Sequence, residues 1–237
     1  MSMTKRRFAV WGLILALCTG TAGMTTAYAA EKTISSVKLQ IYTDLEVGDR
    51  IGDASIDIDS TTAPGGGIAI SGSTDRYQIK EADWTTSSSK EISVGYQPEL
   101  KIRLEVTDSD YAFKGTYRSS NVTVKGAEFV SASKSSGDLV IKAKLKPIKG
   151  TFEAPEDAYW KDNAKGTAKW EEPDNGGTGQ YEVELRKGSS KIHTVETTGK
   201  TYNFYPYMTQ AGTYKFRVLT IAKTSKQVDY GKSSEWV

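Results

Sequence analysis

The sequence predicts an all-β protein built from two antiparallel β-sandwiches. Apolar and polar residues alternate in many short runs, which is the pattern of strands that bury one face. Turn-forming residues, such as Pro64-Gly65-Gly66-Gly67, separate these runs at the regular spacing typical of sandwiches. Between residues 32 and 149, apolar residues do not recur at helical spacing for long enough to indicate a helix.

The first 29 residues have the features of a secretory signal peptide. Lys5, Arg6 and Arg7 precede an apolar run over residues 8–17, and Ala27-Tyr28-Ala29 forms a cleavage site after Ala29. A transmembrane anchor is the first alternative, but the apolar run is shorter than a membrane-spanning helix needs. Lipidation at Cys18 is the second, and the bulky Leu17 before the cysteine departs from lipoprotein sites. We therefore expect a secreted, extracellular protein.

Removal of the signal peptide changes the charge balance. The whole chain has 31 basic and 29 acidic residues, whereas residues 30–237 have 28 and 29, a net charge of −1. A nearly neutral protein lacks the basic surface that nucleic acid or anionic membranes attract. Cys18 is the only cysteine, so the mature chain has neither a disulfide nor a thiol nucleophile. This composition is typical of proteins exported by Gram-positive bacteria.

The first predicted domain covers residues 32–149, and the boundary after it lies near residues 148–154. The clearest alternation is Leu100-x-Ile102-x-Leu104-x-Val106, which predicts a half-buried strand. Further strands are expected around residues 37–41, 56–58, 68–70, 77–79, 111–113, 122–124, 129–130 and 139–145.

The second predicted domain covers residues 153–237 and alternates in the same way. Trp170 and Tyr181 lie in runs separated by the turn Pro173-Asp174-Asn175-Gly176-Gly177, and further strands are expected near residues 202–204 and 214–218. Its arrangement resembles a fibronectin type III domain: Trp170 with Pro173 three residues on, the turn, Tyr181, and Met208 six residues before Tyr214. The last spacing resembles a tyrosine corner, which implies that the Tyr214 hydroxyl bonds to the backbone upstream.

The first domain resembles the immunoglobulin-like modules of Gram-positive secreted and cell-wall-binding surface proteins. The resemblance lies in Asp110-Tyr111-Ala112-Phe113, followed by Asn121-Val122-Thr123-Val124-Lys125-Gly126. It implies an architecture in which such a module precedes a fibronectin-like unit, and no catalytic residues. Whether the chain continues past Val237 into an anchoring region is left open.

Few residues suggest chemistry. His193 is the only histidine; nothing near it in sequence marks a nucleophile or an orienting carboxylate, so we interpret it as a solvent-facing strand residue. Asp57 and Asp59 are expected to share one strand face, with Asp53 before them. Asp108 and Asp110 are weak candidates for Ca²⁺ ligands, because oxygen-rich loops hold this ion. We expect no catalytic residues, no cofactor and no phosphate loop at the triple glycine.

Aromatic residues are the better candidates for binding. Tyr205 and Tyr207 flank Pro206 beside a turn, and Trp84 follows a predicted strand, so all three are candidate contacts for a glycan or protein ligand. The predicted function is that of a non-catalytic binding or spacer protein for adhesion or cell-wall-associated interactions. The alternative is a carbohydrate-binding accessory module; a secreted hydrolase is disfavoured.

Overall fold

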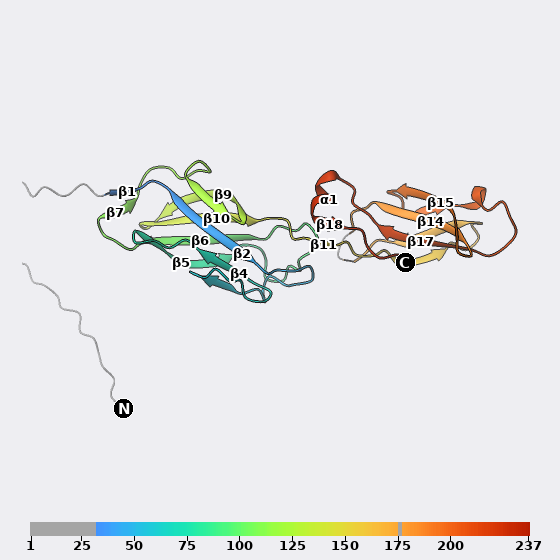
Figure 1. The fold of residues 1–237 in the computed structure, drawn as a ribbon, viewed down its shortest axis with the longest axis horizontal. Coiled ribbons are helices and arrows are strands. Elements are labelled where there is room, and N and C mark those ends of the chain that lie inside the picture. Colours follow the sequence, from blue (N-terminus) through green and yellow to red (C-terminus); the bar gives the residue numbers. More distant parts are fainter. Residues whose placement is uncertain (1–31, 175–176) are drawn as a thin grey trace, which may run out of the picture. The chain divides into compact units, whose positions relative to one another are not determined.

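The computed structural model describes residues 32–174 and 177–237 and is nearly all β (Figure 1), which confirms the predicted all-β class. The predicted signal peptide, its predicted cleavage site after Ala29 and Cys18 lie outside the described residues, as do two residues of the predicted turn, Asn175 and Gly176. Within the described ranges, no helix is long and apolar enough to cross a membrane.

The strands coloured blue to green in Figure 1 form three sheets. One is antiparallel with the order β5-β6-β10-β9, one is mixed with the order β3-β4-β2-β8, and one is the parallel pair β1-β7. Their bounds are β1 (Lys32–Ile34), β2 (Val37–Thr43), β3 (Ile56–Ile58), β4 (Ile68–Ser71), β5 (Tyr77–Trp84), β6 (Glu99–Val106), β7 (Tyr111–Phe113), β8 (Val122–Lys125), β9 (Ala127–Ser135) and β10 (Asp138–Leu145).

Strand direction is where the structure departs from the predicted antiparallel sandwich. β2 pairs antiparallel with β4 but parallel with β8, and β3 pairs parallel with β4. Alternation determines which face of a strand is buried, and it is identical for either direction of the neighbouring strand. The sequence pattern therefore located these strands without indicating their direction.

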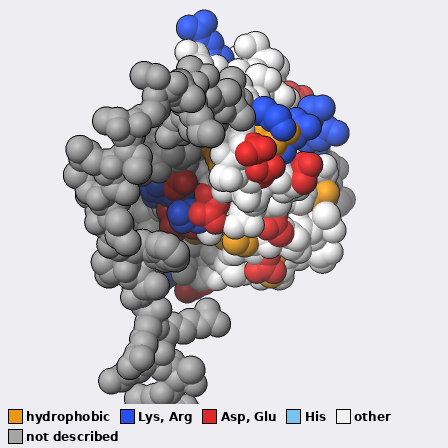
Figure 2. Space-filling model, turned by 90° about the vertical axis from the view of Figure 1, so that its left-hand side faces the viewer, with side chains coloured by type: hydrophobic (Ala, Val, Ile, Leu, Met, Phe, Trp, Pro, Cys, Tyr) orange, Lys and Arg blue, Asp and Glu red, His pale blue; other side chains and the backbone are white. Residues whose placement is uncertain are grey.

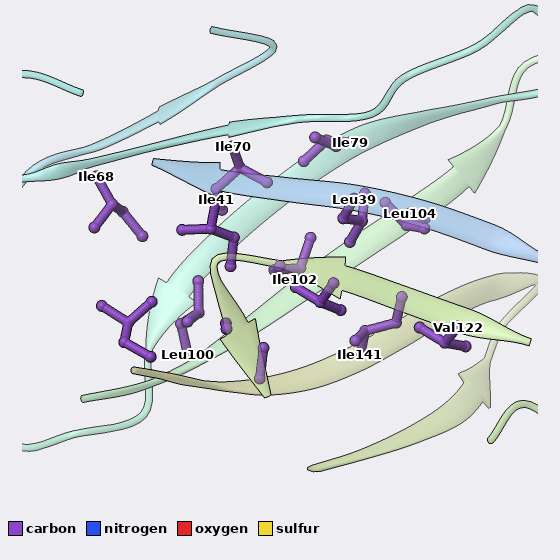
Figure 3. Close-up of a cluster of buried hydrophobic side chains, with 14 of the residues drawn as sticks. Leu39, Ile41, Ile68, Ile70, Ile79, Leu100, Ile102, Leu104, Val122 and Ile141 are labelled. Atoms are coloured by element: carbon purple, nitrogen blue, oxygen red, sulfur yellow. The ribbon is translucent and has the colours of Figure 1, made fainter. Parts of the chain in front are cut away.

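Alternating side chains of the two large sheets meet in one apolar layer (Figure 3). Leu39 and Ile41 of β2 lie in this layer with Leu100, Ile102 and Leu104 of β6, and all five are at most 5% exposed. Polar residues occupy the positions between them, so each strand has one core face. This layer is the core expected from the sequence runs at 37–41 and 100–106.

The strands coloured yellow to red form two three-stranded sheets and a parallel pair. The orders are β12-β13-β16 and β15-β14-β17, and β11 pairs with β18. Their bounds are β11 (Gly150–Thr151), β12 (Glu156–Trp160), β13 (Thr167–Glu171), β14 (Tyr181–Lys187), β15 (Ser190–Thr197), β16 (Thr201–Asn203), β17 (Tyr214–Thr220) and β18 (Gly231–Lys232), with a 3-10 helix η1 (Tyr205–Tyr207) and the helix α1 (Ser225–Tyr230).

A second cluster of buried side chains lies between these sheets. Trp170 and Tyr181 are fully buried, and their rings meet edge to face with centroids 5.6 Å apart. Pro173 is also buried, while Met208 and Tyr214 are half-buried and pack against the cluster. The five residues on which the fibronectin resemblance rests are therefore buried or pack against this cluster. The resemblances themselves, and the division into domains 32–149 and 153–237, stay predictions.

Two local features were not predicted. Thr224 caps the start of the helix α1: its side chain accepts from the Gln227 backbone N–H, and the Gln227 side chain accepts from the Thr224 backbone N–H. This capping box is visible in the sequence as Thr-x-x-Gln. Asp59 follows β3 with φ of +54°, so the strand ends before it and the predicted shared face of Asp57 and Asp59 is wrong.

Candidate functional site

The candidate site is an aromatic surface formed by β15, β16 and η1, which we call the aromatic end and define by His193, Tyr202, Tyr205 and Tyr207. Phe204 joins β16 to η1 and is fully buried, so it anchors the turn in the core. The Asn203 side-chain oxygen accepts from the Tyr205 backbone N–H at 2.9 Å. Because Pro206 has a fixed φ, the turn presents both of its tyrosines in a defined conformation.

His193 stacks on Tyr207, with ring centroids 3.7 Å apart and planes 14° apart. Its ring is also nearly parallel to that of Tyr202, at 6.2 Å, and meets Phe204 edge to face. His193 is half-buried because it pairs with core-facing Leu185 and so shares the inward face of its sheet. The solvent-facing interpretation of His193 was therefore wrong: its ring contacts are aromatic.

The two tyrosines that stack on His193 are joined through their hydroxyl groups, which lie 3.5 Å apart. The hydrogen bond with Tyr207, together with burial, raises the pKa of Tyr202 above its ordinary value. Tyr207 is 37% exposed and Tyr205 is 55% exposed, so both predicted binding residues are accessible. Aromatic rings that combine an exposed face with a polar edge are suited to contact a ligand.

Trp84, the third predicted binding residue, contacts other parts of the fold through both its indole N–H and its ring. Its indole N–H donates to the carbonyl oxygen of Ala54 at 2.9 Å, and its half-buried ring packs against the first core. The structure therefore separates Trp84 from the two tyrosines of the aromatic end. A buried indole N–H usually needs such a partner, which explains the position without a ligand.

The predicted Ca²⁺ candidates, Asp108 and Asp110, lie in the turn between β6 and β7. Asp108 accepts from the Asp110 backbone N–H at 2.9 Å, and Asp110 lies 3.9 Å from the Lys32 amine. Within residues 32–174 and 177–237, no group of three or more histidine or acidic side chains is placed to hold a metal ion. Ca²⁺ needs several oxygen ligands at once, and the contact between these two aspartates is a hydrogen bond within the turn.

An ion cluster that was not predicted surrounds the buried Glu184 on the outer face of β14. Glu184 is 2% exposed and accepts from Arg217 Nε and Nη2 at 3.1 and 3.2 Å, with Arg186 and Lys191 also paired to it. Burial on its own raises the pKa of Glu184, but hydrogen bonds and charges from Arg217 and Arg186 outweigh it and hold the pKa below its ordinary value. The Arg217 guanidinium lies 4.1 Å from the centre of the Trp236 ring.

Charged residues of the first group of sheets are also paired. Lys80 lies 2.9 Å from Glu105, and Arg103 lies 2.7 Å from Glu81 and 3.4 Å from Asp138. Figure 2 shows acidic and basic side chains next to one another on the face at the left-hand side of Figure 1. Mixed charges of this kind cancel at a distance, in contrast to the continuous basic surface that binds nucleic acid.

No protein-family model matches the chain, and a comparison with characterised proteins finds no significant match. The candidate site therefore rests on geometry alone. The aromatic end places two exposed tyrosines on a rigid turn, and the ring contacts around His193 support that turn from beneath. Such an arrangement can hold a ligand by stacking and hydrogen bonding.

Proposed function

We propose that this chain is an exported, non-catalytic binding protein of the extracellular surface, whose aromatic end contacts a ligand in adhesion or in cell-wall-associated interactions. The observation that carries this proposal is the exposure of Tyr205 and Tyr207 on a turn anchored by buried Phe204. Loops held by a rigid β-scaffold are a common place for binding residues. The signal-peptide features of residues 1–29 support export, and the composition supports a Gram-positive source.

A non-catalytic role also agrees with the surroundings of His193. A general base needs a reacting group within reach and a partner that orients it, whereas the ring of His193 stacks on Tyr207. Because one face of the imidazole is covered in this way, His193 supports the turn. We propose the same supporting role for Tyr202.

Co-sedimentation with purified Gram-positive cell walls tests the proposal. We expect saturable binding of the purified protein, weakened roughly fivefold or more by Tyr205→Ala, because exposed aromatic side chains often dominate binding energy. Tyr159→Ala is the matched control: Tyr159 is 43% exposed on β12 and lies outside the aromatic end, so binding is expected to stay within about twofold of wild type. Absence of wall binding, or equal losses in both variants, would contradict the proposal.

A further inference from the structure

A groove lies beside the β12–β13 turn, and nothing above assigns it a role. Its volume is about 660 Å³. It is lined by residues 160–166, Met208 and Tyr214. We propose that this groove binds one ring of a neutral saccharide. The inference deepens the proposed binding function and rests on it, but it uses a different set of residues from Tyr205 and Tyr207.

The inner wall of the groove is aromatic. Trp160 is half-buried and meets Phe216 edge to face, with centroids 4.7 Å apart, and Met208 and Tyr214 pack against the same core cluster. Tyr214 is held in place because its hydroxyl donates to the Gln210 carbonyl at 2.9 Å. A sugar ring has one face of C–H groups, and an apolar aromatic wall can cover this face without leaving a buried polar group unpaired.

The Trp160 indole N–H is available to a ligand. No residue within the described ranges accepts a hydrogen bond from it, and it is not among the fully buried polar atoms. Trp84 differs, because its indole N–H is already bonded to Ala54. The inner wall thus combines an aromatic surface with one free donor, which is the pairing that a hydroxyl-bearing ring requires.

The rim of the groove is polar and carries both donors and acceptors. Lys161, Asp162, Asn163 and Lys165 are all exposed, and no hydrogen bond or ion pair between described residues occupies the side chains of Asp162 and Asn163. Sugar hydroxyl groups donate and accept, so they can pair with carboxylate, amide and ammonium groups at once. The rim has two basic side chains and one acidic side chain, and with the Asn163 amide they offer both donors and acceptors to a hydroxylated ring.

The rim is also held in one conformation before any ligand arrives. Lys161 N–H donates to the Thr167 carbonyl at 2.8 Å, and Phe204 N–H donates to the Gly166 carbonyl at 2.7 Å. Gly166 has φ of +67°, and a Cβ there would lie 2.7 Å from the Tyr205 nitrogen, so only glycine allows this close approach. A preformed rim lowers the entropy that binding must overcome.

An NMR titration with cellotetraose, maltotetraose and N-acetylchitotetraose tests the inference, read at the Trp160 indole N–H resonance and assigned with Trp160→Phe. We expect at least one of these saccharides to shift that resonance saturably. Asp162→Ala and Asn163→Gly should each weaken that binding roughly fivefold or more, since each removes a hydrogen-bonding group. Glycine is chosen because Asn163 has φ of +58°, where alanine would add strain. Asp57→Ala, an exposed carboxylate on β3, is the control and should change affinity by less than about twofold.

The outcomes separate this inference from the proposed function. If no saccharide shifts the Trp160 resonance at up to about 20 mM, a range that covers weak binding, the groove is not a saccharide site. The same conclusion holds if both Asp162→Ala and Asn163→Gly bind the saccharide as tightly as wild type does. Wall binding that persists in either case would leave the role of Tyr205 intact. Saccharide binding without wall binding would support the groove and contradict the proposed function.

Discussion

The imidazole of His193 lies on the phenol ring of Tyr207, with centroids 3.7 Å apart, so the chain's one histidine supports an exposed tyrosine of the aromatic end. The contact joins β15 to η1, two elements separated by β16 in the chain. It orients Tyr207 and leaves the more exposed Tyr205 without a ring contact among the described residues. The two tyrosines are therefore expected to differ in their contributions to stability.

We expect Tyr207→Ala to lower the free energy of unfolding by roughly 0.5–1.5 kcal/mol, because it removes an aromatic pair in addition to buried area. Tyr205→Ala is the matched control, since it removes the same group from the same turn without breaking a stack. Urea unfolding of the two variants measures the difference. Equal stability losses would show that the stack contributes nothing.

Tyr214→Phe tests the bond expected of a tyrosine corner. The Tyr214 hydroxyl donates to the Gln210 carbonyl at 2.9 Å and accepts from the Gln210 N–H at 3.3 Å, while the ring packs against the core. The variant keeps the ring and loses both bonds, so we expect a loss of about 1 kcal/mol in thermal or denaturant unfolding. Tyr205→Phe should be neutral, as its hydroxyl has no partner among the described residues. A neutral Tyr214→Phe would mean that water replaces the bonds at no cost.

Glu184→Gln is expected to destabilise the protein at neutral pH by roughly 1–3 kcal/mol, because it leaves Arg217 and Arg186 beside a neutral group in a buried position. The wild-type pKa of Glu184 is lowered on folding, so the carboxylate stabilises the fold above its unfolded pKa, and this stability is lost as pH falls through the folded value. The difference between wild type and variant should therefore shrink in acid. Unfolding measured from about pH 7 to pH 3, the range that spans ordinary glutamate pKa values, checks this.

Glu182→Gln is the control for that experiment, since Glu182 lies two residues away on the same strand and makes no ion pair with another described residue. It should have the same stability as wild type across the pH range. A Glu184→Gln protein whose deficit stays constant down to the lowest pH would contradict the assigned role of the carboxylate.

Cleavage after Ala29 predicts that the exported protein begins at Ala30. Intact-mass measurement of protein collected from the medium of an expressing Gram-positive host tests this. Ala29→Pro, which alters the cleavage site, should retain the leader on the product. A mass that corresponds to lipid attached at Cys18, or to the uncut chain, would replace the predicted leader with the lipoprotein or anchor alternative.

The positions of most strands follow from the sequence because burial of one strand face imposes a two-residue period. The runs at residues 37–41, 100–106 and 139–145 all form strands with alternating burial. The same period holds for parallel and antiparallel neighbours, so only the structure decided that β2 pairs parallel with β8. The backbone bond of Tyr214 was predictable, since it joins residues only four positions apart.

The contacts of the candidate site residues are made with residues far away in the chain, which a local sequence pattern cannot indicate. Tyr205 and Tyr207 were predicted from a proline between tyrosines, a local feature, and they are exposed. The stack of His193 on Tyr207, the bond of Trp84 to Ala54 and the ion pairs of Glu184 each join residues that lie apart in the chain. The sequence by itself therefore determined which residues form strands and turns, because those depend on near neighbours. Tertiary packing alone decided which aromatic and charged side chains are free to bind, because it brings distant strands together.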